Sequence, residues 1–144
     1  MKKCYLDSNV LIYFKDSSSS HHRQSVDKLM SLLQKDFALF ISVLVLDEFL
    51  YVFRYGLLKK KIKDPFIKLK DSIEDILELP NLTMLAAPIE TSAQIKVVSF
   101  MEKYDLNPRD AYHLLTMSEN KIDYFATFDN DFNQVFKSKI LKLF

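Results

Sequence analysis

Near its start the chain reads Cys4-Tyr5-Leu6-Asp7-Ser8-Asn9-Val10-Leu11. A short apolar run, typical of a buried strand, meets an acid and then continues into a segment typical of a helix. We therefore expect a strand over residues 4–6 and a short helix over residues 9–14. The same alternation of short strands and longer helices recurs along the chain. This alternation predicts an α/β domain built from βα units around a central, mostly parallel sheet.

Apolar periodicity predicts the other elements. Helices are expected over residues 25–34, 44–55, 65–79, 90–104 and 111–118, and strands over residues 37–41, 82–86, 124–127 and 140–144. Ser42 is expected to cap the helix at 44–55, and Gly56 to end it in the left-handed conformation that favours glycine. In the helix at 90–104, the spacing of Ile95, Val98 and Met101 predicts that these side chains face the core.

Length and composition exclude several classes of protein. The 144 residues, 49% of them hydrophobic, predict a single domain over residues 1–144. One Gly excludes a P-loop or a dinucleotide-binding fingerprint, and one Cys excludes an internal disulfide or a cysteine-rich zinc site. Asp7 interrupts the basic, apolar start too early for a signal peptide, and the longest mostly apolar stretch, residues 37–46, falls short of the roughly 20 residues that span a bilayer. We expect a cytoplasmic protein with no membrane partner.

Charge is unevenly placed along the chain. The net charge is +1, but residues 1–70 carry 13 Lys and Arg against 7 Asp and Glu, whereas residues 71–144 carry 7 against 12. Such asymmetry permits a local basic surface on a nearly neutral protein. Lys59, Lys60 and Lys61 form a basic run that is suited to nucleic-acid phosphates, although a solvated face is the more common fate of such a run.

Acids cluster where a parallel sheet places its ligands, beyond the carboxyl ends of the strands. They are Asp7 after the first strand, Glu48 in the helix after the second, Asp110 in the helix that follows Asn107-Pro108, and Asp129 and Asp131 after the fourth strand. Carboxylates within about 5 Å repel by several kcal/mol per pair at an effective dielectric near 20, so they bind protons or a cation. Mg²⁺ or Mn²⁺ accepts such oxygen ligands. The chemistry implied is metal-assisted hydrolysis of a nucleic acid.

Four segments resemble the signatures of the PIN-domain nuclease family, most closely its VapC-type toxin ribonucleases. They are Asp7-Ser8-Asn9-Val10-Leu11, Glu48 in a helix after a strand that ends in Ser, Asn107-Pro108-Arg109-Asp110-Ala111, and Thr127-Phe128-Asp129-Asn130-Asp131-Phe132. The resemblance spans residues 4–132 and implies a three-layer sandwich around a parallel sheet. The family often has glycine near these turns, where this chain has Asn107 and Asn130; asparagine also tolerates left-handed backbone.

The resemblance implies an endoribonuclease that leaves 5′-phosphate and 3′-hydroxyl ends. Its catalytic acids would be Asp7, Glu48, Asp110 and Asp129, which with Asp131 would ligate Mg²⁺ or Mn²⁺. Candidate substrate-binding residues are Asn9 and Thr127 from the resemblance, and Arg109, Lys59, Lys60 and Lys61 from their charge. The resemblance also implies an RNA substrate, a homodimer and a cognate antitoxin protein, as in a toxin–antitoxin pair.

Each candidate also has an ordinary structural interpretation. Asp7 and Asp110 are both suited to capping a helix, and Arg109 to a surface salt bridge. Glu48 stands beside a second acid, Asp47, and helical geometry alone does not choose between them. His113, one turn beyond Asp110, is expected to be a packed helix residue.

Two other functions compete with the nuclease. A haloacid-dehalogenase-like phosphatase would use Asp7 as its nucleophile, but that family has a second Asp two residues on, where this chain has Asn9. A catalytically silent RNA- or protein-binding scaffold of the same fold is the second rival. A nuclease directed at DNA also stays open.

Overall fold

A five-stranded, all-parallel sheet forms the centre of the computed structural model, which describes all 144 residues. Its strands are β1 (Lys3–Leu6), β2 (Ala38–Ser42), β3 (Leu82–Leu85), β4 (Tyr124–Ala126) and β5 (Lys142–Leu143), in the spatial order β3-β2-β1-β4-β5. The first strand is central, and Cys4, Tyr5 and Leu6 are completely buried. Burial on both faces explains why β1 is mostly apolar after Lys3.

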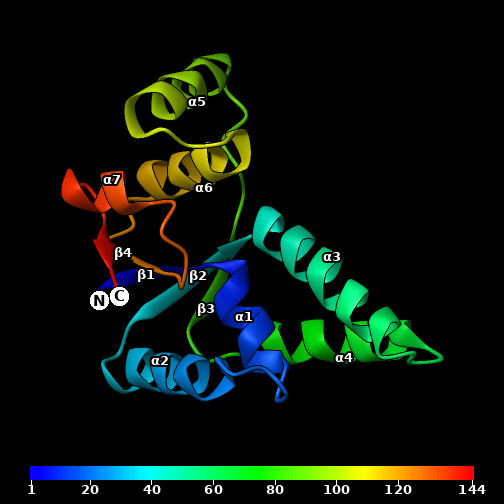
Figure 1. Ribbon diagram of the computed structural model, residues 1–144. Helices are drawn as coiled ribbons and strands as arrows, with labels where there is room; N and C mark the ends of the chain where they lie inside the picture. Colours follow the sequence, from blue (N-terminus) through cyan, green and yellow to red (C-terminus); the bar gives the residue numbers. More distant parts are fainter.

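Helices cover both faces of this sheet. They are α1 (Ser8–Lys15), α2 (His22–Gln34), α3 (Val43–Lys59), α4 (Pro65–Leu77), α5 (Thr91–Tyr104), α6 (Pro108–Glu119) and α7 (Asn133–Lys137). Figure 1 shows α5 and α6 on one side of the sheet and α1 and α2 on the other, while α3 and α4 form a hairpin that projects away from it. The predicted α/β class and three-layer arrangement are confirmed. None of the helices is long and apolar enough to cross a membrane.

The carboxyl edge of the sheet is tied together where β1 and β4 end. The backbone N–H of Asp7 donates to the carbonyl of Ala126 at 2.9 Å, which extends the β1–β4 pairing by one residue. Ser42 ends the neighbouring strand β2 and leads directly into α3. The segments that carry Asp7, Glu48 and Asp129 therefore start from adjacent points on one edge.

The prediction that Gly56 ends its helix is wrong. α3 continues through Gly56 to Lys59, no glycine has a positive φ, and the left-handed residue is Lys61 (φ 55°). Leu57 lies just beyond the glycine and is buried, so packing of one more turn outweighs the glycine's preference for a helix end. Ser42 is the N-cap residue as predicted, but its side chain makes no capping hydrogen bond.

The predicted inward face of α5 is also partly wrong. Ile95 and Val98 are 67% and 63% exposed, whereas Ala93, Val97 and Tyr104 are buried. Met101 is partly buried against the core. The helix packs mainly on α6, so only a narrow stripe of its surface is covered and other apolar side chains remain outside.

Candidate active site

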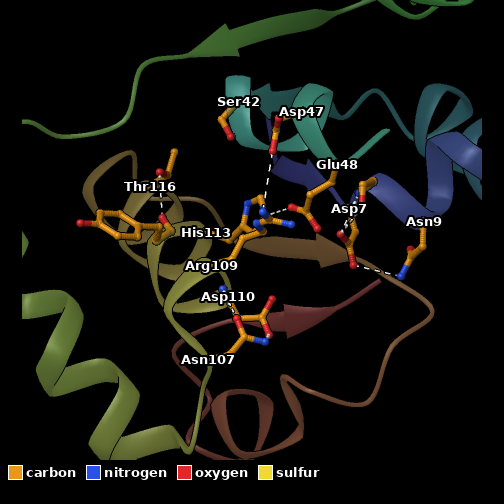
Figure 2. A network of polar contacts seen from close by, with 12 residues as sticks. Asp7, Asn9, Ser42, Asp47, Glu48, Asn107, Arg109, Asp110, His113 and Thr116 are labelled. Atoms are coloured by element: carbon orange, nitrogen blue, oxygen red, sulfur yellow. Dashed lines mark hydrogen bonds and ion pairs between the residues drawn. The ribbon is translucent and has the colours of Figure 1, made fainter. Parts of the chain in front are cut away.

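A polar pocket of ≈ 500 Å³ opens at the carboxyl edge of the sheet. Its lining contains no hydrophobic side chain and consists of Glu48, Asn107, Pro108, Arg109, Asp110, Asp129 and Asp131. These residues come from α3, from the start of α6 and from the loop after β4. Figure 2 shows Asp7 beside this group, with Glu48 between His113 and Asp7. The structure thus places four of the five acids that the sequence singles out around this pocket and the fifth, Asp7, beside it.

Asp7 caps a helix and faces the site at the same time. Its Oδ1 accepts a hydrogen bond from the backbone N–H of Ser8 (2.7 Å), the N-cap interaction expected from the sequence. Its Oδ2 accepts from Thr127 Oγ1 (2.6 Å) and from Asn9 Nδ2 (3.0 Å). The carboxylate is therefore fixed by residues at the start of α1 and by Thr127 directly after β4.

Thr127 and Asn9 connect the segment that carries Asp7 with the loop that carries Asp129. Thr127 Oγ1 accepts from the backbone N–H of Asp129 (3.0 Å) and from Asn9 Nδ2 (3.3 Å). Asn9 Oδ1 accepts in turn from the backbone N–H of Phe128 (3.3 Å). These bonds hold the loop that carries Asp129 against the start of α1.

Asn107, not Asp110, caps α6, so the N-cap interpretation of Asp110 is wrong. Asn107 Oδ1 accepts from the backbone N–H of Asp110 (3.0 Å), and its Nδ2 donates to Asp110 Oδ2 (2.7 Å). Asp110 lies in the first helical turn, where the helix dipole favours a negative charge. Asn107 therefore holds the Asp110 side chain in place where it lines the polar pocket.

Burial and mutual repulsion disfavour the charged forms of two acids. Burial is the main cause that raises the pKa of Asp7, with Asp129 and Glu48 adding to it against the hydrogen bond from Thr127. Burial, followed by the charge of Asp131, raises the pKa of Asp110 to about 6. Such shifts concentrate at functional sites, because structural acids are normally paired with a base.

Glu48 binds a buried histidine. His113 Nε2 lies 2.5 Å from Glu48 Oε1, and the His113 side chain is 2% exposed. The choice between the two adjacent acids of α3 is clear in the structure, because Glu48 lines the polar pocket whereas Asp47 forms an exposed pair with Arg109. The sequence interpretation of His113 as a packed residue is correct but missed this contact. No local signal could have found it, because the two residues lie 65 positions apart.

The PIN domain family model matches residues 4–137 of the chain. The chain belongs to the PIN domain family. No curated protein matches it by sequence.

Several solved structures have a similar fold over nearly the whole chain. The chain is similar to VapBC2 from Rickettsia felis, bound to a DNA fragment from its promoter (TM-score 0.68, 18% identity, 99% of this chain and 97% of that chain). It is also similar to Mycobacterium tuberculosis VapC20, a sarcin–ricin loop cleaving toxin (TM-score 0.61, 12% identity, 92% and 94% covered), and to FitAcB from Neisseria gonorrhoeae (TM-score 0.57, 17% identity, 98% and 96% covered). At these identities the likeness concerns the fold.

The basic candidates of this PIN domain lie at different distances from the acids. Arg109 lines the pocket and forms a long, exposed ion pair with Asp47 (3.8 Å). Lys59 ends the projecting helix α3, and Lys60 and Lys61 follow it, roughly 16 Å along the helix axis from Glu48 at 1.5 Å per residue. They do not meet the acids.

The donor set of the pocket suits a hard, hydrated divalent ion. No three His, Cys, Asp or Glu side chains lie close enough together to ligate one ion directly. Each of Asp7, Glu48 and Asp110 is instead held by a neutral side chain or an imidazole, while the ligand atoms offered to the pocket are carboxylate oxygens. Mg²⁺ keeps several waters and is commonly bound through one or two carboxylates, so this spread arrangement fits it.

Proposed function

We propose that this PIN domain is a Mg²⁺- or Mn²⁺-dependent endoribonuclease. The observation that carries the proposal is the gathering of four acids from three chain segments around one polar pocket, with Asp7 beside them. Burial, followed by repulsion from neighbouring acids, raises the pKa of Asp110 there to about 6. A site that served only stability would pair each of these acids with a base, whereas only Glu48 has a basic partner, His113. The repulsion between the carboxylates stays uncompensated until a cation binds among them.

Asp7, Glu48, Asp110 and Asp129 hold the ion in this proposal, directly or through water, and Asp131 adds a further ligand. A divalent ion held there would supply activation of the attacking water and would offset charge on the phosphodiester. The acids Asp129 and Asp131 are exposed and make no side-chain hydrogen bond within the chain, so they are free to adjust to a ligand.

The protein side chains position the acids and the RNA. Thr127 and Asn9 donate to Asp7 and keep its carboxylate turned toward the acid cluster. Arg109 exchanges its weak pair with Asp47 for a substrate phosphate. In the reaction a water oxygen bonds to phosphorus, the bond from phosphorus to the 3′-oxygen breaks, and that oxygen takes up a proton. The products carry 5′-phosphate and 3′-hydroxyl ends.

We further propose that the protein is the cytoplasmic toxin of a toxin–antitoxin pair and forms a homodimer. Similar folds occur in a toxin–antitoxin complex from Klebsiella pneumoniae and in the toxin VapC20 from Mycobacterium tuberculosis. The α3–α4 hairpin also carries an apolar groove of ≈ 580 Å³ that includes Leu50, Tyr51, Tyr55, Leu58 and Phe66. Exposed apolar surface of this kind is typical of protein–protein contact.

The test is cleavage of end-labelled structured RNA by the purified protein with Mg²⁺, Mn²⁺ or EDTA. We expect metal-dependent cleavage that falls at least about 100-fold in Asp7→Asn and Asp110→Asn, the scale seen when one charge-stabilising group is removed from an active site. Glu102→Gln, on the exposed surface of α5, is the matched control and should cut like the parent. Equal cleavage by all variants would mark the activity as contamination and defeat the proposal.

Matched single-stranded DNA in the same assay separates the rival functions. Preferential cutting of DNA would replace the ribonuclease by a DNA-directed nuclease. Binding of RNA without cleavage under every metal condition would favour the silent scaffold. Release of phosphate from small phosphomonoesters would favour the phosphatase.

A further inference from the structure

A chain of buried polar side chains runs from the sheet to the candidate site. Ser42 Oγ lies 2.5 Å from Tyr5 Oη, Tyr5 Oη lies 3.0 Å from His113 Nδ1, and His113 Nε2 lies 2.5 Å from Glu48 Oε1. The four residues come from four different elements, β2, β1, α6 and α3. Ser42, Tyr5 and His113 are 1%, 0% and 2% exposed, so no water competes for these bonds.

The chemistry of the groups fixes which atom of the imidazole faces the acid with a proton. A carboxylate only accepts hydrogen bonds, so the Nε2 of His113 must be the donor to Glu48. The Tyr5 hydroxyl is bonded to the opposite ring nitrogen and can turn to suit it. It therefore holds the ring in the one orientation that presents N–H to Glu48.

Glu48 depends on this chain more than the other acids depend on their neighbours. Asp110 is held by Asn107, three residues away, and Asp7 is held in part by Asn9, two residues away. Glu48 instead sits on a helix that projects away from the sheet, and its one side-chain hydrogen bond spans 65 residues to His113. The second oxygen, Oε2, makes no bond within the chain, and Glu48 lines the pocket.

We propose that Ser42, Tyr5 and His113 are positioning residues that hold the Glu48 carboxylate in place to receive the divalent ion. This inference rests on the proposed function, since it concerns the same site. The core has no need of a polar chain at this position, because apolar side chains of similar volume would fill it without buried hydrogen-bonding groups. One oxygen of Glu48 is fixed and the other is left for the ligand.

Tyr5→Phe tests this row of hydrogen bonds and leaves Glu48 itself unchanged. It removes one hydroxyl from a residue that does not contact Glu48 and keeps the ring that packs against Phe125. We expect the Kd for Mn²⁺ alone, measured by titration calorimetry on the full chain, to rise 10- to 100-fold, the range found when an outer partner of a metal ligand is lost. RNA cleavage should lose kcat with KM unchanged.

Tyr112→Phe is the matched control. It removes a hydroxyl on the same helix as His113, together with a 2.8 Å hydrogen bond to Gln94, outside the chain. We expect it to leave the Kd for Mn²⁺ unchanged. Nitrogen NMR of the His113 ring supplies a further measurement, with proton placement on Nε2 in the parent and a redistribution between the two nitrogens in Tyr5→Phe.

A pair of substitutions at His113 separates positioning from packing. His113→Gln keeps an N–H donor within reach of Glu48 and should retain more Mn²⁺ affinity than His113→Leu, although both disturb the core. If Tyr5→Phe does not fold, Ser42→Ala tests the same row of hydrogen bonds at its end remote from Glu48.

The possible results separate the positioning role of Ser42, Tyr5 and His113 from the proposed nuclease activity. A parent that binds Mn²⁺ and cuts RNA, with Tyr5→Phe and Ser42→Ala matching it in both, overturns the positioning role and leaves the nuclease standing. A parent that neither binds Mn²⁺ nor cuts RNA overturns both. Loss of Mn²⁺ affinity in Tyr5→Phe but not in Tyr112→Phe supports the positioning role of Ser42, Tyr5 and His113.

Discussion

The two ends of the sheet are built from opposite chemistry. Near the amino ends of β2 and β4, Phe37 meets Tyr124 and Phe144 edge to face, each at 5.2 Å between ring centroids. Lysine ammonium groups lie over these rings, among them Lys35 over Phe144 at 5.4 Å and Lys142 over Tyr124 at 5.5 Å. We call Phe37, Tyr124 and Phe144 the aromatic end. The contacts between these rings and the cation–π contacts of Lys35 and Lys142 stabilise the folded chain.

The carboxyl end instead collects groups that oppose folding. Burial and neighbouring acids raise the pKa of Asp7 and Asp110, so their charged forms are disfavoured in the folded chain. The contrast teaches that one edge of the sheet stabilises the fold while the other maintains an unfavourable charge cluster that a ligand relieves. Such a division is expected where a rigid scaffold carries a reactive site.

Truncating the aromatic end should give the largest effect on stability. Phe37 is 3% exposed, so Phe37→Ala removes a buried ring and leaves a cavity, which costs about 3 to 5 kcal/mol of unfolding free energy. Urea unfolding measures the loss. The Kd for Mn²⁺ of the folded fraction should not change; a parallel loss of Mn²⁺ affinity would show that the two ends are not independent.

Mn²⁺ should stabilise the folded protein by binding to the acids at the carboxyl end of the sheet. An ion that binds the folded chain alone adds about 2.7 kcal/mol at a concentration 100 times its Kd, which raises Tm by roughly 5 to 10 °C for a chain of this size. Thermal unfolding with and without Mn²⁺ measures the shift. In Asp7→Asn the shift should largely disappear, whereas an equal rise in parent and variant would place the ion elsewhere.

Removing a repelled charge should stabilise the protein while it harms the site. Asp110 has a folded-state pKa of about 6 against 3.8 ordinarily, so the folded chain holds this proton more tightly than the unfolded chain does. The associated stability is present below about pH 4 and is lost as pH rises through 6. Asp110→Asn should escape this loss.

The measurement is Tm against pH in EDTA for the parent and Asp110→Asn. Because the side chain is partly exposed, we expect a gain on the order of 2 °C at neutral pH and little difference below about pH 4. Glu102→Gln should follow the parent throughout. A variant that is less stable than the parent at neutral pH would contradict the repulsion.

The sequence predicted the fold better than the environment of each residue. Short buried strands and amphipathic helices leave a local signal, so β1 and the βα order were expected and found. The end of α3 was missed, because packing of Leu57 decided it over the local preference of Gly56.

The candidate site divides in the same way. The gathering of its acids follows from topology, since parallel strands end at one edge. The bond between His113 and Glu48 joins residues 65 positions apart through side chains, and no local pattern of residues specifies such a contact. Their catalytic roles stay predictions.

The smallest expected effect returns to the aromatic end. Lys35→Gln removes the ammonium over Phe144 and leaves the ring contact between Phe144 and Phe37 in place. An exposed cation–π contact contributes roughly 0.5 kcal/mol, so Tm should fall by only about 1 to 2 °C. Lys139→Gln, an exposed lysine with no aromatic partner, is the control for the loss of one positive charge. Lys35→Gln and Lys139→Gln with equal Tm would mean that the aromatic end is stabilised by its rings alone, and the contrast with the carboxyl end would then rest on apolar packing against charge repulsion.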